Sequence, residues 1–142
     1  MTQRTQSQPQ THARIDPALC GELVSLAPGR AELRLTTSPS MLADDSGLVH
    51  GGFVFGLADH AAMLAVNHPN VVLGSASTRF LKPVRVGEVV LARAVCTAES
   101  GRKRTVEVEV LRDEEPVMTG EFICFVLDRH VLADMSTSPE RP

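Results

Sequence analysis

The sequence predicts an α+β domain in which a curled antiparallel sheet wraps around one long helix. Two observations support this prediction. The stretch 52–67 is apolar around most of its circumference, which is typical of a helix buried in a core. Four segments with strand character then follow one another between short turns, which is typical of an antiparallel meander. A helix without a broad polar face needs cover on several sides, and a curled sheet supplies it.

Composition limits the domain count and the class of protein. The 142 residues, 43% hydrophobic and 22% charged, suit one globular domain with a real core. We predict that this domain covers residues 15–130, between a disordered tail over 1–14 and a loose tail over 131–142. A formal net charge of -3 argues against a general nucleic-acid binder.

The compartment follows from the cysteines and the apolar segments. The three cysteines are odd in number, and their spacing fits neither a disulfide framework nor a metal site. The first twelve residues lack the apolar run of a signal peptide, and the longest apolar stretch is shorter than the ~20 residues that span a bilayer. We therefore expect a cytoplasmic protein with free thiols and no membrane partner.

The first half of the chain supplies a hairpin, a loop and the helix. Residues 18–36 read as two strands joined by a Pro-Gly turn. Residues 37–50 form a loop rich in small and polar groups. The helix over 52–67 then ends before Pro69, because proline cannot continue a helix.

The second half reads as strands. The most regular of them alternates strictly, and we expect Val106, Val108 and Val110 to face inward while Glu107 and Glu109 face outward. The four predicted segments are 71–84, 88–99, 102–112 and 116–128.

Asp59 is the most informative polar residue, because it interrupts the apolar helix. Eleven of the sixteen residues from Gly52 to Asn67 are Phe, Val, Leu, Ala or Met. A carboxylate there loses solvation, and it persists only if it is paired, hydrogen-bonded or shifted in pKa. Such carboxylates are often catalytic, although pairing with an arginine or a backbone group is the structural alternative. The neighbouring His60 points about 100° around the helix, so we expect a structural or interface role for it.

His50, Gly51 and Gly52 open the helix about two turns before Asp59. Backbone N–H groups at a helix start are unpaired and carry partial positive charge, and glycine lets a ligand approach them closely. A carbonyl oxygen that develops negative charge would be stabilised there. The segment therefore predicts a carbonyl-binding end followed by an acid or base, although a plain helix-entry turn has the same residues.

These residues resemble a known family. They are similar to the hotdog-fold thioesterase superfamily, particularly the PaaI-type acyl-CoA thioesterases. The similarity lies in four features: the run His-Gly-Gly from His50, the Leu-Ala-Asp that ends at Asp59, the Ala-rich helix that closes on Asn67, and the segment SASTRFLKPVRVGE from Ser75. The resemblance covers roughly residues 15–128. It implies a hotdog fold, with five to six strands around the central helix, and an acyl-CoA substrate.

The resemblance also implies an assembly. In such relatives the site lies between two subunits, so we expect a homodimer or homotetramer, and the open edge of a curled sheet also needs cover. No metal or organic cofactor is expected apart from the coenzyme A of the substrate, because the five histidines form no zinc pattern.

Roles for individual residues follow from the resemblance. It implies that Asp59 is the base or nucleophile, that the N–H of Gly51 polarises the thioester carbonyl, and that His50 helps to shape the site. PaaI-type enzymes usually carry Asn six residues before this histidine, where the chain has Asp44. Either Asp44 points away from the site, or it shares a proton with Asp59, since a second nearby acid raises the pKa of one of the two.

Basic residues are the expected partners of the coenzyme A phosphates. The tripeptide Arg102–Arg104 lies at a predicted hairpin tip, where it could meet the nucleotide or simply be solvated. With the helix-start glycine, the candidate substrate-binding residues are Gly52, Arg79, Lys82, Arg102, Lys103 and Arg104.

Three functions remain open from the sequence. The first is hydrolysis of an acyl-CoA thioester. The second is acyl-CoA binding without catalysis, as in repressors of fatty-acid synthesis that use a hotdog domain, although the first seventeen residues are too few and too polar for a helix-turn-helix. The third is an enoyl-CoA hydratase or dehydratase, because Asp45 and His50 have the five-residue spacing that hotdog hydratases use.

Overall fold

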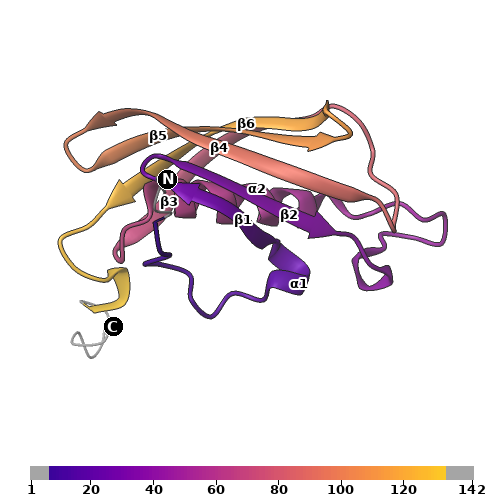
Figure 1. Cartoon of the computed structure of the whole chain (residues 1–142), viewed down its shortest axis with the longest axis horizontal. Helices are drawn as coiled ribbons and strands as arrows, with labels where there is room; N and C mark the ends of the chain where they lie inside the picture. The colour runs from indigo at the N-terminus through magenta and orange to yellow at the C-terminus, as the bar shows by residue number, and fades with distance from the viewer. Residues whose placement is uncertain (1–6, 134–142) are drawn as a thin grey trace, which may run out of the picture.

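A computed structural model of the chain describes residues 7–133. One long helix and six strands form this part of the molecule (Figure 1). The helix is α2, Gly51–Val66, and two short helical segments, α1 (Pro17–Cys20) and η1 (Pro39–Met41), precede it. The strands are β1 (Glu22–Ala27), β2 (Arg30–Thr36), β3 (Val71–Phe80), β4 (Val89–Ser100), β5 (Lys103–Arg112) and β6 (Glu115–Val126).

The strands form a single antiparallel sheet in the order β1-β2-β4-β5-β6-β3. This order makes β1 and β3 the two edges. The sheet arches over α2, so that the helix lies along its concave face (Figure 1). The α+β hotdog architecture that the sequence predicts is therefore confirmed, with six strands around one central helix.

The core lies between α2 and the inner face of the sheet. The alternation of β5 has the predicted outcome, because Val106, Val108 and Val110 are buried while Glu107 and Glu109 are exposed. Most of the helix contributes to the same core; its buried residues are Val54, Leu57, Ala58, His60, Ala61, Ala62, Met63, Leu64 and Ala65. Each large apolar side chain buried in this way contributes about 1.5–3 kcal/mol, which fixes the helix in place.

Strand β3 is shorter than predicted. It ends at Phe80, and residues 81–88 form a loop that carries Pro83, whose nitrogen has no hydrogen to donate to a sheet. This loop lies beside the loop that precedes α2, because Val49 N–H donates to the Val84 carbonyl and Val86 N–H donates to the Gly47 carbonyl. Both loops are at the right-hand end of Figure 1.

Part of the tail predicted to be disordered packs on the domain. The Asn67 side chain, at the left-handed C-cap of α2, accepts a hydrogen bond from Gln10 N–H at 2.7 Å and donates one to the Gln8 carbonyl at 3.0 Å. Ser7 N–H donates to the Leu26 carbonyl. Residues 1–6 and 134–142 of the predicted tails lie outside the described residues.

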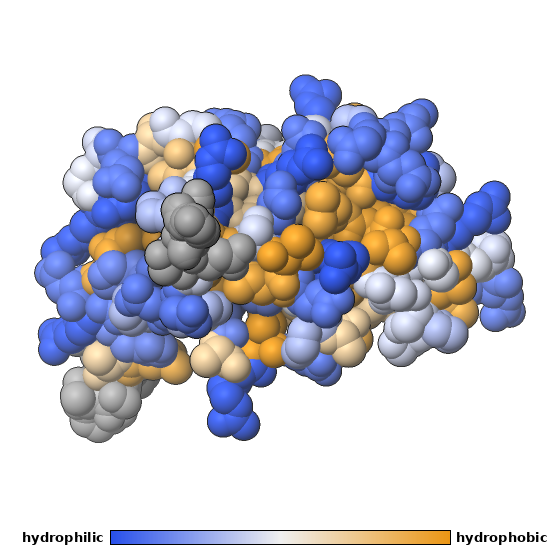
Figure 2. Space-filling view, viewed as in Figure 1, coloured by the Kyte–Doolittle hydropathy of each residue, from blue (hydrophilic) through white to orange (hydrophobic). Residues whose placement is uncertain are grey.

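The surface is mixed in character. Figure 2 shows apolar side chains near the middle of one face, with hydrophilic ones around them. Strand β1 forms one edge of the sheet, and three apolar residues of α1 and β1 are more than a third exposed: Leu19, Leu23 and Val24. None of the helices between residues 7 and 133 has the length and apolarity needed to cross a membrane.

Gly21 tests the packing of the helix against the sheet. Its φ of +100° is one that side chains rarely adopt, and a Cβ at this position would collide with the Leu57 side chain. Gly21→Ala should therefore lower the free energy of unfolding more than Gly87→Ala, by about 1–3 kcal/mol, in urea denaturation. Gly87 is the matched control, because its φ is +95° and its surroundings are open. Equal losses in the two variants would show that α2 is not packed tightly here.

Candidate active site at the start of the central helix

The N-terminus of α2 is open to a ligand. His50 is its N-cap residue, in an extended conformation, and within the described residues no capping hydrogen bond from a side chain is formed there. The first backbone N–H groups of a helix have no partner inside it, so those of Gly51 and Gly52 remain available as donors. They give the helix start a partial positive charge that favours an oxygen with negative charge.

Two rings flank this helix start. A Cβ on Gly52 would lie 2.8 Å from Nε2 of His50, and a Cβ on Gly51 would lie 3.5 Å from the ring of Phe80. The absence of side chains at 51 and 52 therefore lets both rings approach the backbone. Phe80 was not among the residues predicted for the site; its only sequence signal is its place in the segment after Ser75.

An apolar pocket of about 280 Å³ adjoins Gly51. Apart from Lys82 its lining is apolar or glycine: Leu48, Val49, Gly51, Val54, Phe80, Leu81, Pro83, Val84 and Val117. The Lys82 ammonium forms an ion pair with Glu115 at 2.6 Å. The pocket suits an apolar chain whose carbonyl group reaches the helix start.

Asp59 has an unsatisfied oxygen. Its Oδ1 is buried, and no group between residues 7 and 133 forms a hydrogen bond with it. Burial raises the pKa of this carboxyl above its ordinary value, and the smaller effect of the nearby His60 charge opposes that rise. The structural alternative is an arginine paired with Asp59, and no arginine in residues 7–133 forms that ion pair. A buried oxygen without a partner costs about 1–3 kcal/mol or more, so it points to a ligand, water or second chain.

One face of α2 is left partly uncovered by the sheet. Gly52, Gly56 and Asp59 recur at spacings of four and three and share this face, and a Cβ on Gly56 would meet nothing within 4 Å. The ring of Phe55 packs on the buried Phe122 of β6 at 5.5 Å. Asp59 thus lies at the boundary between the core and an open helix face.

His60 lies on a different side of the helix from this face. It is only 6% exposed, its Nδ1 is 3.1 Å from the Cys20 carbonyl oxygen, and its ring stacks on His12. Burial lowers the pKa of both histidines. These contacts join α2 to α1 and to the segment before it, in keeping with a structural role.

The loop acids face solvent. Asp44 accepts hydrogen bonds from the backbone N–H and the hydroxyl of Ser46, and these bonds lower the pKa of its carboxyl. Within one chain Asp44 therefore turns into its own loop and does not share a proton with Asp59. Asp45 is exposed, and the described residues show no hydrogen bond between Asp45 and His50.

Comparison with known families agrees with this geometry. Residues 46–119, which include the helix start and Asp59, match the family model of the thioesterase superfamily. The chain belongs to this superfamily.

Solved structures of similar proteins support the assignment to the thioesterase superfamily. A protein from Pyrococcus horikoshii is 49% identical with a TM-score of 0.89, and the match covers 91% of this chain and 99% of that one. A mutant of the phenylacetic acid degradation protein PaaI from Thermus thermophilus is 35% identical with a TM-score of 0.72, covering 79% and 100%. The expected resemblance to PaaI-type proteins is confirmed.

The curated relatives are longer proteins. Methylthioribose-1-phosphate isomerase of Aquifex aeolicus (strain VF5) is 50% identical over 119 residues, 83% of this chain and 26% of that protein. Transcription factor FapR of Shouchella clausii (strain KSM-K16) is 33% identical over 106 residues, 74% of this chain and 56% of that protein. The chain thus spans about a quarter of the length of the isomerase and about half of the length of FapR.

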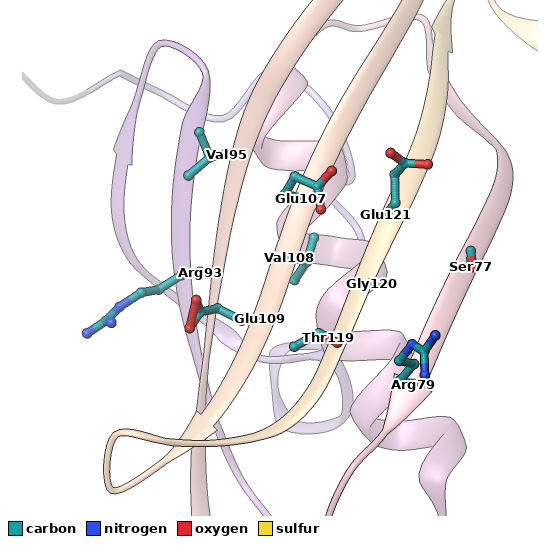
Figure 3. A pocket seen from close by; sticks show the side chains of 10 residues that line it. All are labelled: Ser77, Arg79, Arg93, Val95, Glu107, Val108, Glu109, Thr119, Gly120 and Glu121. Carbon is teal, nitrogen blue, oxygen red and sulfur yellow. The ribbon is translucent and has the colours of Figure 1, made fainter.

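The basic residues expected to bind substrate are dispersed over the thioesterase domain. Lys82 lines the pocket beside Gly51. Arg79 lies on the outer face of the sheet, away from α2, opposite Thr119 (Figure 3). Residues 102–104 are at the far end of the molecule, where Arg102 pairs with Asp128 (Figure 1). Strand β3 runs between that end and the helix start, and its ten residues span about 30 Å.

Residues 7–133 contain no group of three or more His, Cys, Asp or Glu side chains placed to hold a metal ion. The three cysteines are free. Burial is the largest effect on the Cys124 thiol, and with a smaller contribution from the Asp59 charge it raises the pKa of this thiol to about 12.

The Cys124 thiol reports whether the inner face of β6 near Asp59 is closed. A pKa of about 12, against an ordinary 9.0, lowers the thiolate fraction at pH 8 about 1000-fold. In a Cys20→Ser/Cys96→Ser variant, Cys124 should react with a disulfide reagent only as fast as the protein unfolds. The same variant in urea is the control. Rapid reaction in the folded state would show that water reaches this face.

Proposed function

We propose that this chain hydrolyses an acyl-CoA thioester to a free acid and coenzyme A. The observation that carries the proposal is the buried Oδ1 of Asp59, which has no hydrogen-bond partner in residues 7–133, on the helix whose start presents the N–H groups of Gly51 and Gly52. Membership of the thioesterase superfamily and the similarity to a PaaI protein support it. The apolar pocket beside Gly51 provides room for part of the substrate.

The reaction needs a polarised carbonyl and an attacking group. The helix-start N–H groups would donate hydrogen bonds to the carbonyl oxygen and stabilise the negative charge of a tetrahedral intermediate. Asp59 would either attack the carbonyl carbon, forming an anhydride that water hydrolyses, or remove a proton from the attacking water. In both cases the carbon–sulfur bond breaks and the thiolate of coenzyme A leaves and takes up a proton. The raised pKa of Asp59 makes it a stronger base than an ordinary aspartate.

The helix separates these two groups too widely for one chain to use both. Asp59 follows Gly51 by eight residues, which is about 12 Å along the helix axis. A reacting carbonyl group must lie about 3 Å from both the donors and the attacking group. We therefore propose that each site combines the helix start of one chain with Asp59 of another.

The β3 edge is the proposed contact between the two chains. Of the ten residues of β3 only Val71 is buried, so the strand is accessible to a partner. Its free edge also offers unpaired backbone groups to another strand. Antiparallel pairing of two β3 edges about a two-fold axis would set the two α2 helices side by side in opposite directions. With Gly51 of one chain beside Asp59 of the other, the axis would pass near Phe55 and Gly56; Gly56 has no side chain, and the Phe55 ring packs on Phe122. Two such dimers could form a tetramer.

A second candidate function is acyl-CoA binding without hydrolysis. The 33% identity to transcription factor FapR over 74% of the chain favours it. Calorimetry and a thiol assay for released coenzyme A, run on the same acyl-CoA, separate the two functions. Binding without release would replace the hydrolase by the binding protein.

Asp59→Asn tests the proposed chemistry. The amide has nearly the same shape but neither the charge nor the basicity, so kcat on a panel of acyl-CoAs should fall about 100-fold or more. Asp44→Asn is the matched control, and because its carboxylate is engaged by Ser46 the expected change is much smaller. Comparable rates in wild type and Asp59→Asn would remove Asp59 from the mechanism, and an equal loss in Asp44→Asn would show that the loop acid also takes part.

A further inference from the structure

A second cavity adjoins the pocket at Gly51. It has a volume of about 520 Å³ and is lined by Ser46, Leu48, Pro83, Arg85, Glu88 and Arg112. Leu48 and Pro83 line both cavities, so the two are adjacent, and we refer to them together as the groove between the loop before α2 and the loop after β3. The outer part of the groove, the 520 Å³ cavity, carries Arg85, Arg112 and Glu88, whereas the inner part, the pocket at Gly51, is apolar apart from Lys82.

Arg112 is held firmly in this groove. Its side chain is only 20% exposed, and Nη1 donates to the Pro83 carbonyl at 2.7 Å and to Oε1 of Glu88 at 3.0 Å. Its Nη2 lies 3.6 Å from Glu115, which also pairs with Lys82. Glu88 in the groove is therefore paired with Arg112, and Glu115 beside it is paired with Lys82 and Arg112.

Arg85 is placed differently. Its backbone N–H donates to Glu88 at 2.8 Å, and its carbonyl accepts from the Thr37 hydroxyl, so its main chain is fixed. Its guanidinium forms no hydrogen bond or ion pair with any group in residues 7–133. A planar guanidinium on a fixed backbone, at the mouth of an apolar groove, suits a phosphate group that it can bind through two parallel hydrogen bonds.

We infer that Arg85, supported by Arg112, binds the phosphate groups of the coenzyme A part of the substrate. The pantetheine arm would then follow the groove past Leu48 and Pro83, so that the thioester reaches the N–H groups of Gly51 and Gly52. The inference rests on the proposed function for its substrate. It assigns phosphate binding to the end of the molecule that carries the start of α2, and not to the hairpin at Arg102–Arg104.

Two thioesters with the same acyl group test the inference, one of coenzyme A and one of pantetheine, which has no phosphate. Wild type should prefer the coenzyme A ester in kcat/KM, because only that ester reaches Arg85. In Arg85→Gln this preference should fall about 10-fold or more, mainly through KM, which is the usual cost of a lost hydrogen bond between charged groups. Arg34→Gln removes an exposed arginine of β2 that pairs with Glu22 of β1 and does not line the groove, so it should keep the wild-type preference.

Two kinetic results would overturn the inference. One is an unchanged preference in Arg85→Gln, or no preference in wild type. The other is loss of the preference in Arg102→Gln but not in Arg85→Gln, which would move the phosphates to the hairpin.

Calorimetry distinguishes a failure of the proposed hydrolysis from a failure of the proposed phosphate site. If wild type cleaves neither ester, Kd values for coenzyme A and for pantetheine are compared in wild type and Arg85→Gln. Tighter binding of coenzyme A that is lost in the variant supports the phosphate site even without hydrolysis. Equal Kd values for the two ligands in wild type would reject it.

Discussion

The burial of α2 by the curled sheet is the constraint on which the rest of the structure depends. The sheet covers the helix on most sides, and each large side chain buried between them contributes about 1.5–3 kcal/mol. The helix therefore cannot rotate to bring Asp59 to water. The unsatisfied Oδ1 destabilises the fold by about 1–3 kcal/mol, and the packing of the whole helix offsets this loss. A group kept at such a cost is a strong candidate for function.

The same constraint organises the surroundings of the site. Because the sheet ends at β3, the face of α2 with Gly52, Gly56 and Asp59 is left partly open beside a free strand edge. Because β3 runs back along α2 toward the start of the helix, its last residue, Phe80, lies against Gly51. The open helix face, the free edge and the groove are thus consequences of one topology. The proposed dimer would close the first two and leave the groove accessible from solvent.

Much of the fold could be predicted from local patterns in the sequence. The apolar helix, its start at the glycine pair and the inward valines of β5 follow from periodicity, which depends on neighbours along the chain. Asp59 was detectable because a single charge interrupts an apolar run. The packing of residues 7–14 was not, because it depends on the amide of Asn67, and a polar tail has the same composition whether or not it finds such a partner.

The groove shows the limit of sequence interpretation more clearly. Arg85 and Arg112 are 27 residues apart, and contacts distant in the sequence bring them together: Glu88 accepts from both, and Arg112 donates to the Pro83 carbonyl. Three consecutive basic residues at 102–104 gave a stronger local signal, although they lie at the other end of the molecule. Asp44 was ambiguous for a related reason, because an acid that closes a turn on Ser46 and an acid that joins a catalytic pair look alike in a polar loop.

The central claim is that each site takes its helix start from one chain and its carboxylate from another. Its most direct test is to unfold Asp59→Asn and Gly51→Pro together and refold the mixture. Proline is tolerated at the first helical position but lacks the N–H, and the extended His50 is compatible with it. Each variant refolded alone should be inactive. The mixture should recover about a quarter of wild-type activity, because half of the dimers are mixed and each mixed dimer has one intact site. A mixture that forms mixed dimers and stays inactive would contradict the shared site and place both groups within one chain.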